Sequence, residues 1–161
     1  MKKYELTEET FTVFGKTLYR IRAVRDFGSV KTGEFGGYIE KEENLSHFGN
    51  AWISGDARVF GDARVSGDAR VSGNARVFGN AEVFNTRHFF VQGPIGSRDG
   101  YVTFYRTKDD TVEVRCGCFS GSLQEFVNQV EETHGGSRYE KEYKLAAELA
   151  KVCIRLEGES R

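Results

Sequence analysis

The sequence offers few side chains for acid–base catalysis, because it contains only three histidines. His47 occupies the aliphatic position of a six-residue repeat, and His88 follows the last regular repeat. A general base has to lie beside a substrate cleft with a suitable pKa, and neither position offers one. We therefore expect no catalytic residue and no enzyme activity.

Cysteine chemistry is the second possibility. Cys116, Cys118 and Cys153 could join His134 in a metal site, but a structural zinc needs four ligands with recognised spacings. Cys116 and Cys118 alternate on a predicted strand, on the face that meets the helices, so core thiols are the simpler interpretation. We expect no metal and no cofactor. Three cysteines also argue against a disulfide framework and fit a reducing compartment.

Basic residues near turns are the candidate anion-binding groups. The glycine-rich loop 93–98 could hold an anion on its backbone N–H groups, aided by Ser97, Arg98, Arg106 and Lys108. The alternative is a plain turn, because the loop opens a strand and lacks the lysine of a phosphate-binding loop. Arg58 and Arg76 are a second candidate, in a groove between subunits, and the alternative there is solvated arginines beside the aspartate of a neighbouring corner.

A six-residue unit recurs from His47 to His88. In each unit an aliphatic residue stands two places after an alanine, so both point the same way in an extended chain. Glycine followed by aspartate or asparagine separates the units, and these residues tolerate tight turns. The pattern predicts parallel strands stacked in coils, because a helix cannot use a period of six.

Units such as GNARV resemble the hexapeptide repeat of the left-handed parallel β-helix, in which three units make one coil of eighteen residues. The resemblance, and not the spacing, implies the left-handed sense and a homotrimer. It also raises an acyl-CoA transferase as an alternative function. Such enzymes use a histidine on a loop extruded from the coils, and no loop interrupts these repeats.

Folding the units onto three faces stacks residues that are eighteen apart. Phe60 then lies over Phe78, and Phe84 faces outward on the next side. Exposed apolar ladders mark interfaces, so these three phenylalanines form the predicted oligomer interface. Trp52, the only tryptophan, either stacks on a ligand or, as we favour, packs against the N-terminal segment.

Different patterns flank the repeats, which predicts three parts: residues 1–46, 47–91 and 92–161. The first is a β-rich cap and irregular coil that covers the open end of the solenoid; it begins with a hairpin, and its charged corner 40–44 should be solvated. The last is a small α+β domain, with a hairpin over 101–116, a helix opening at the capping box of Ser122 and Glu125, and a helix over 137–156 whose apolar stripe includes Leu149. The fold class is mainly β.

The composition excludes some partners. A net charge of −1 over 161 residues leaves no basic excess for general nucleic-acid binding. No apolar run approaches the roughly 18 residues that span a bilayer, and the N-terminus lacks an apolar signal core. We expect a cytoplasmic protein with no membrane partner.

The whole chain is similar to a group of small phage and prophage proteins described as hexapeptide-repeat or polymer-forming. The similar segments are YELTEETFTVFGKTLYRIRAVRDFGSVKTGEFGGYIEKEENLS, the GNARV-type units, GPIGSR, TFYRTKDD, GCFSGSLQEF and THG. This resemblance implies a viral accessory protein in the cytoplasm of an infected bacterium. We expect a non-enzymatic oligomer that inhibits a host defence protein or sequesters a small host signalling molecule such as a nucleotide. A structural assembly protein is a further alternative.

Overall fold

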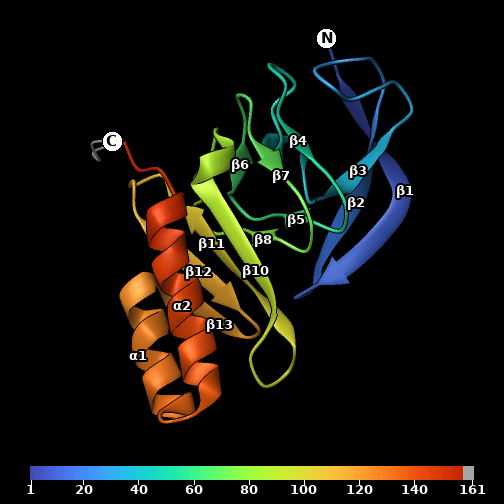
Figure 1. Ribbon diagram of the computed structural model, residues 1–161. Helices are drawn as coiled ribbons and strands as arrows, with labels where there is room; N and C mark the ends of the chain where they lie inside the picture. The colour runs from blue at the N-terminus through green and yellow to red at the C-terminus, as the bar shows by residue number, and fades with distance from the viewer. Residues whose placement is uncertain (158–161) are drawn as a thin grey trace. The chain divides into compact units, whose positions relative to one another are not determined.

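A computed structural model describes residues 1–157 (Figure 1). The chain divides into two compact units, Met1–Thr86 and the residues from Arg87 onward. The first, which we call the solenoid unit, contains β1 (Tyr4–Val13), β2 (Lys16–Ala23), β3 (Phe35–Ile39), the 3₁₀ helix η1 (Glu42–Asn44), β4 (Trp52–Ile53), β5 (Arg58–Val59), β6 (Arg64–Val65), β7 (Arg70–Val71), β8 (Arg76–Val77) and β9 (Glu82–Val83). A short 3₁₀ helix, η2 (Thr86–His88), leads into the second unit.

The repeats form stacked parallel strands, as the six-residue period predicts. Each strand pairs with the one eighteen residues further on: β4 with β7, β5 with β8, and β6 with β9. The aliphatic residues lie in register across these pairs and are buried, as are the alanines two places before them. The corner glycines of the repeats have φ between 62° and 73°, a region that glycine enters readily. The repeats therefore build a β-solenoid with eighteen-residue coils.

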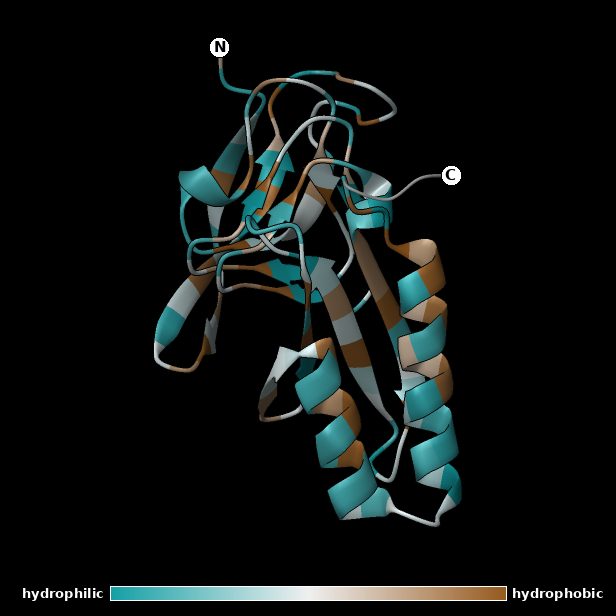
Figure 2. Ribbon diagram, turned by 90° about the vertical axis from the view of Figure 1, so that its left-hand side faces the viewer, coloured by the Kyte–Doolittle hydropathy of each residue, from teal (hydrophilic) through white to brown (hydrophobic). Residues whose placement is uncertain are grey.

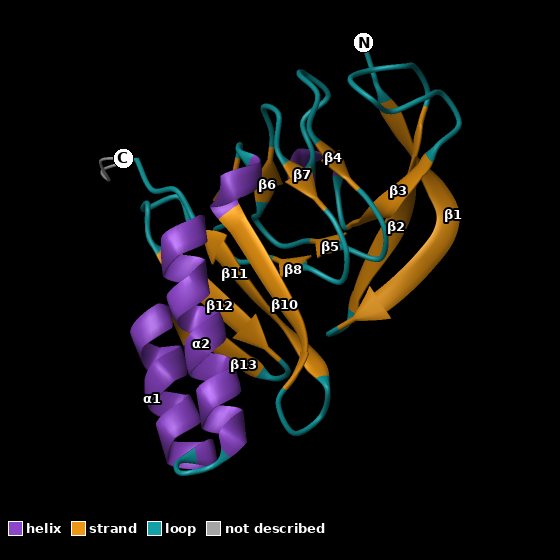
Figure 3. Cartoon of the chain, viewed as in Figure 1, coloured by secondary structure: helices purple, strands orange, loops and turns teal. Residues whose placement is uncertain are grey.

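The N-terminal hairpin extends one face of this solenoid. Strands β1 and β2 pair antiparallel, and β3 pairs antiparallel with β2 but parallel with β5. The resulting sheet has the order β1-β2-β3-β5-β8 (Figure 3). Trp52 is 2% exposed and meets the ring of Phe27 edge-on at 5.3 Å, which confirms that it packs against the N-terminal segment.

The expectation that the charged corner 40–44 is solvated is wrong for Asn44, which is fully buried. The first coil has no coil before it, so its carbonyl groups need other donors. The Asn44 side-chain amide donates to the carbonyls of Gly61 at 3.1 Å and Ala63 at 2.9 Å, and its oxygen accepts from two backbone N–H groups. One side chain thus closes part of the open end.

The second unit, which we call the α+β unit, has a four-stranded antiparallel sheet in the order β10-β11-β12-β13. Helices α1 and α2 lie side by side against this sheet, and Figure 2 shows hydrophilic and hydrophobic residues alternating along both. The predicted capping box is confirmed, because the Glu125 N–H donates to Ser122 Oγ at 3.1 Å and the Ser122 N–H to Glu125 Oε1 at 2.8 Å. The elements are β10 (Phe89–Ile95), β11 (Gly100–Arg106), β12 (Val112–Cys116), β13 (Phe119–Ser122), α1 (Leu123–His134) and α2 (Arg138–Cys153).

Three details of the α+β unit correct the sequence-based expectations. Strands β10 and β13 lie outside the predicted hairpin, and the loop 93–98 begins within β10. Leu149 is 46% exposed, whereas Ala147 is buried. Cys118 is exposed, while Cys116 packs against the core, because the strand ends at Cys116 and a turn at Gly117, with φ of 56°, breaks the alternation.

Within residues 1–157, no helix is long and apolar enough to cross a membrane.

Candidate functional site

Three cations, which we call the cationic cluster, gather at the N-terminal end of the solenoid unit. Lys3 precedes β1, Arg25 follows β2 and Arg70 begins β7. Lys3 is fully buried, and its ammonium donates to the Ala51 carbonyl at 2.7 Å. The ring of Phe27 lies 4.7 Å from this ammonium and 5.9 Å from the Arg25 guanidinium. Lys3 therefore caps a carbonyl of the first coil and brings a positive charge into the interior.

The two arginines lie around the same corner of the coil. Arg25 Nη2 donates to the His47 carbonyl at 3.4 Å. Arg25 Nε is buried and has no hydrogen-bond partner within the described residues 1–157. A Cβ atom added at Gly28 would lie 3.1 Å from Arg70 Nη2 and 3.4 Å from Asn50 Cβ. The Arg25 guanidinium therefore lies against the backbone of His47, and the Arg70 guanidinium lies beside Gly28. Both side chains are half-buried.

The cluster carries positive charge that the described part of the chain does not balance. Lys3, Arg25 and Arg70 form no ion pair with a carboxylate of residues 1–157. Burial, together with the charges of Arg25 and Arg70, lowers the pKa of Lys3 to about 8. Because like charges in a partly dry environment repel, a bound anion would stabilise this arrangement.

A groove of about 470 Å³ begins at the same corner. Its lining combines carboxylates, hydroxyls, an arginine and an aromatic ring, including Glu43, Ser46, His47, Phe48, Arg64 and Ser66. Its volume lies within the range of small-molecule sites, roughly 300–1,000 Å³. His47 and Phe48 line the groove, and the cationic cluster contacts the backbone carbonyls of His47 and Gly49 at the same corner.

His47 does not occupy the aliphatic position expected for it. Leu45 takes that position, because it bridges to Val65 in parallel and is fully buried. The His47 ring stacks on Tyr4 at 4.1 Å. Its Nδ1 accepts from the Lys3 N–H at 3.2 Å, and its Nε2 lies 3.1 Å from a carboxylate oxygen in η1. Both ring nitrogens are engaged, so the contacts hold the ring in place and leave neither nitrogen open to a substrate.

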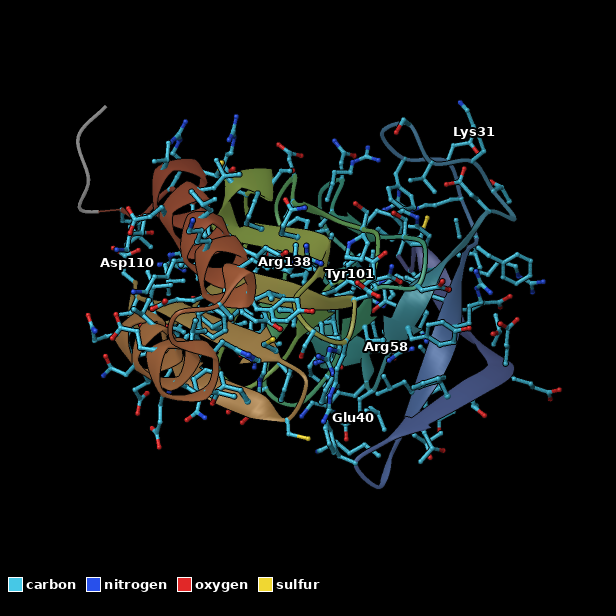
Figure 4. The ribbon with its side chains drawn as sticks, turned by 60° about the horizontal axis from the view of Figure 1, so that its bottom comes forward. Lys31, Glu40, Arg58, Tyr101, Asp110 and Arg138 are labelled. Atoms are coloured by element: carbon cyan, nitrogen blue, oxygen red, sulfur yellow. The ribbon has the colours of Figure 1, made fainter. Side chains whose placement is uncertain are left out.

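The predicted pair Arg58 and Arg76 is in register between β5 and β8. Arg58 is labelled in Figure 4. Its guanidinium lies 3.8 Å from the centroid of the Phe11 ring in β1. A cation–π contact of this kind typically stabilises by about 0.5–2 kcal/mol. Arg58 is therefore half-buried and pairs with no aspartate of residues 1–157. The N-terminal hairpin supplies an aromatic face that the repeat pattern alone does not reveal.

The glycine-rich loop already contacts a carboxylate of the protein. The Gly96 N–H donates to Glu142 Oε1 in α2 at 2.7 Å. Ser97 and Arg98 are exposed. One backbone donor of the loop is therefore occupied from within the α+β unit, and anion binding by Ser97 and Arg98 stays a prediction.

The two basic residues beyond this loop do not gather into a site with it. Arg106 is 3% exposed, and its Nε lies 2.9 Å from Asp110 Oδ1. Lys108 is exposed. Arg106 therefore serves an internal ion pair, because its strand ends in the tight turn that carries Asp110.

The three phenylalanines of the predicted oligomer interface differ in their exposure to solvent. Phe60 and Phe78 stack with ring centroids 4.4 Å apart, as the eighteen-residue coil predicts. Phe60 is only 2% exposed, so the expectation that it lies on an open surface is wrong, whereas Phe84 is 40% exposed. The repeat pattern alone could not show that Phe60 is buried within the chain.

The remaining histidines lie in the α+β unit. His88 is buried, and its pKa is lowered by burial first and then by the charge of Arg106. His134 contacts the rings of Tyr139 and Tyr143. Among residues 1–157, no three histidine, cysteine, aspartate or glutamate side chains converge in a way that could hold a metal ion.

Comparison with known proteins supports the repeat architecture. A family model described as the YdcK beta-solenoid repeat matches residues 51–67, 63–77 and 69–83. A comparison with curated proteins gave no match. The fold therefore defines a repeat β-solenoid protein with two C-terminal helices, and the match is confined to the solenoid coils.

Sequence reasoning missed the cationic cluster. Only the stacking of Trp52 and Arg70, eighteen residues apart and in register between β4 and β7, could be expected from the repeat. Lys3 and Arg25 lie in the irregular N-terminal segment, where no period predicts which coil they reach. A basic residue directly before the first strand, with no acid beside it, was the one available signal.

Proposed function

We propose that this protein is a non-enzymatic phage accessory protein that sequesters a small phosphorylated host molecule, such as a signalling nucleotide, at the cationic cluster. The similarity to phage and prophage proteins supplies the setting, the cytoplasm of an infected bacterium. The left-handed sense of the coil, the hexapeptide-repeat class and the homotrimer belong to the same proposal and rest on that resemblance.

The observation that carries the proposal is that the cluster has no carboxylate partner among residues 1–157. Phosphate groups bind arginine through short, charge-assisted hydrogen bonds, and two half-buried guanidinium groups are available at one corner. Lys3 is fully buried, so it contributes positive potential while Arg25 and Arg70 supply the contacts. The sequence left a host protein and a small molecule as alternative targets. The cluster is compact and recessed, which favours the small molecule.

The first test is native mass spectrometry of the purified protein beside its denatured mass. We expect an oligomer that carries additional mass, and we expect denaturation to release this mass. The released mass would give the chemical class of the ligand. If the protein is purified from cells that contain the host molecule and the oligomer carries no added mass, the host-protein alternative is favoured.

The second test is calorimetric titration with inorganic pyrophosphate. The double variant Arg25→Gln/Arg70→Gln should bind at least about tenfold more weakly than the wild type, because a hydrogen bond to a charged group contributes about 1.5–3 kcal/mol. Arg138→Gln is the matched control, since Arg138 is an exposed arginine of α2, and its affinity should not change. A wild type that does not bind pyrophosphate, or a double variant that binds equally well, would contradict the proposal.

A further inference from the structure

One large apolar side chain stands out in solvent at the corner of the first coil. Phe48 is 82% exposed. It lies between His47, which is stacked on Tyr4, and Gly49, whose φ of 73° turns the chain. A Cβ atom at Gly49 would lie 2.8 Å from the Gly67 carbonyl, so the next coil supports this corner closely. The Phe48 ring is therefore held out on a well-anchored backbone.

All three members of the cationic cluster approach this corner. The Lys3 ammonium lies 3.3 Å from the Gly49 carbonyl, and Arg25 Nη2 donates to the His47 carbonyl at 3.4 Å. Arg70 Nη2 lies by Gly28, the same glycine that Asn50 approaches. An exposed aromatic ring thus stands on the corner whose backbone carbonyls Lys3 and Arg25 contact, and Arg70 lies beside Gly28 near the same corner.

The groove on this corner supplies polar groups near the ring. Phe48 lines it together with Ser46, Ser66 and Glu43. Hydroxyls can donate and accept hydrogen bonds, and a carboxylate accepts them. A planar heterocycle with both donors and acceptors on its edge matches this set, whereas a simple phosphate does not use it.

Resting on the proposed function, we propose that the ligand is a nucleotide whose base stacks on Phe48. Its phosphate binds Arg25 and Arg70 within the potential of Lys3. The edge of the base faces Ser46, Ser66 and Glu43. Stacking on an aromatic side chain suits any base, because every base has a π-face, so Phe48 contributes affinity and the groove residues decide between bases.

The test compares the four ribonucleoside 5′-monophosphates with ribose 5-phosphate, which carries the phosphate but no base. Phe48→Ala should weaken binding of the preferred nucleotide by roughly 5- to 150-fold, the range for loss of one stacked base. It should leave the affinity for ribose 5-phosphate unchanged. Phe48→Trp should retain nucleotide binding and report it by quenching of the new exposed indole.

Phe14→Ala is the matched control, because Phe14 is 69% exposed at the turn between β1 and β2; it should leave both affinities unchanged. If no nucleotide binds at least fivefold more tightly than ribose 5-phosphate, or if Phe48→Ala binds the nucleotide as the wild type does, this inference is overturned. The proposed function fails separately, when the wild type binds neither ribose 5-phosphate nor pyrophosphate.

Discussion

Lys3 shows how one residue can serve both the fold and a candidate site. Its ammonium caps the carbonyls of Gly49 and Ala51 at the open end of the solenoid. A buried ammonium beside two guanidinium groups destabilises the fold when it is charged. Neutral caps such as Asn44 carry no such cost, and the anion proposed to bind at the cluster would offset the charge of Lys3.

The stability of the protein should depend on pH through Lys3. Burial and the charges of Arg25 and Arg70 lower its pKa from 10.5 to about 8, so between these values the folded protein binds fewer protons than the unfolded chain. Stability should therefore rise as the pH increases through this window and stay lower below pH 8, by on the order of 1–2 kcal/mol between pH 7.5 and 9.5. Chemical denaturation of the wild type and Lys3→Met at both pH values checks this.

Lys3→Met should lose the pH dependence, since methionine does not titrate. Pyrophosphate should also raise the melting temperature of the wild type more at pH 7.5, where Lys3 is protonated, than at pH 9.5. Equal pH profiles for the two proteins would show that Lys3 titrates normally.

At the scale of the element, the corner glycines decide whether coils can stack. The repeat corners from Gly49 to Gly79 use glycine with positive φ, but the space around them differs. A Cβ at Gly67, with φ of 63°, would lie 2.6 Å from the Phe84 carbonyl, whereas one at Gly73, with φ of 69°, meets nothing within 4 Å. Replacing glycine by alanine at each of these two positions therefore separates the cost of backbone strain from the cost of steric overlap.

Gly67→Ala should destabilise the solenoid more than Gly73→Ala. Both place a Cβ in the left-handed region, at a cost of about 1–2 kcal/mol. Gly67→Ala adds an overlap with backbone that cannot move aside, which should cost about 1–3 kcal/mol more. Thermal unfolding followed by circular dichroism would measure the difference, and equal melting temperatures would mean that the coils at this corner separate easily.

At the scale of the whole molecule, the homotrimer remains a prediction, and its interface needs revision. Phe60 is buried within the chain, so Phe60→Glu should unfold the protein by placing a charge in an apolar site. It is therefore no test of assembly. Phe84, at 40% exposure, is the member of the predicted set that can take a charge without being buried in the monomer.

Phe84→Glu should dissociate the oligomer and leave the monomer folded, because three like charges would meet at the interface of a trimer. Native mass spectrometry gives the mass, and circular dichroism verifies the fold. Phe14→Glu is the control on a remote turn. A variant that keeps the wild-type mass would place the interface on another face.

The sequence by itself determined the elements whose signals are local. The six-residue period set the coils because each unit carries its own corner glycine and its own pair of inward residues. The capping box at Ser122 likewise set the start of α1, since both partners lie within one turn. These features need no knowledge of distant segments.

Tertiary structure decided everything that depends on how irregular segments meet the coils. Tyr38 pairs with Arg58, and Leu45 with Val65, across twenty residues and not eighteen, so the period failed at His47. The Phe11 ring on Arg58 has the same origin, whereas the Glu142 contact to Gly96 depends on packing within the α+β unit. The cationic cluster joins residues 3, 25 and 70, and such long-range contacts are set by packing of the cap against the first coil, which no local pattern encodes.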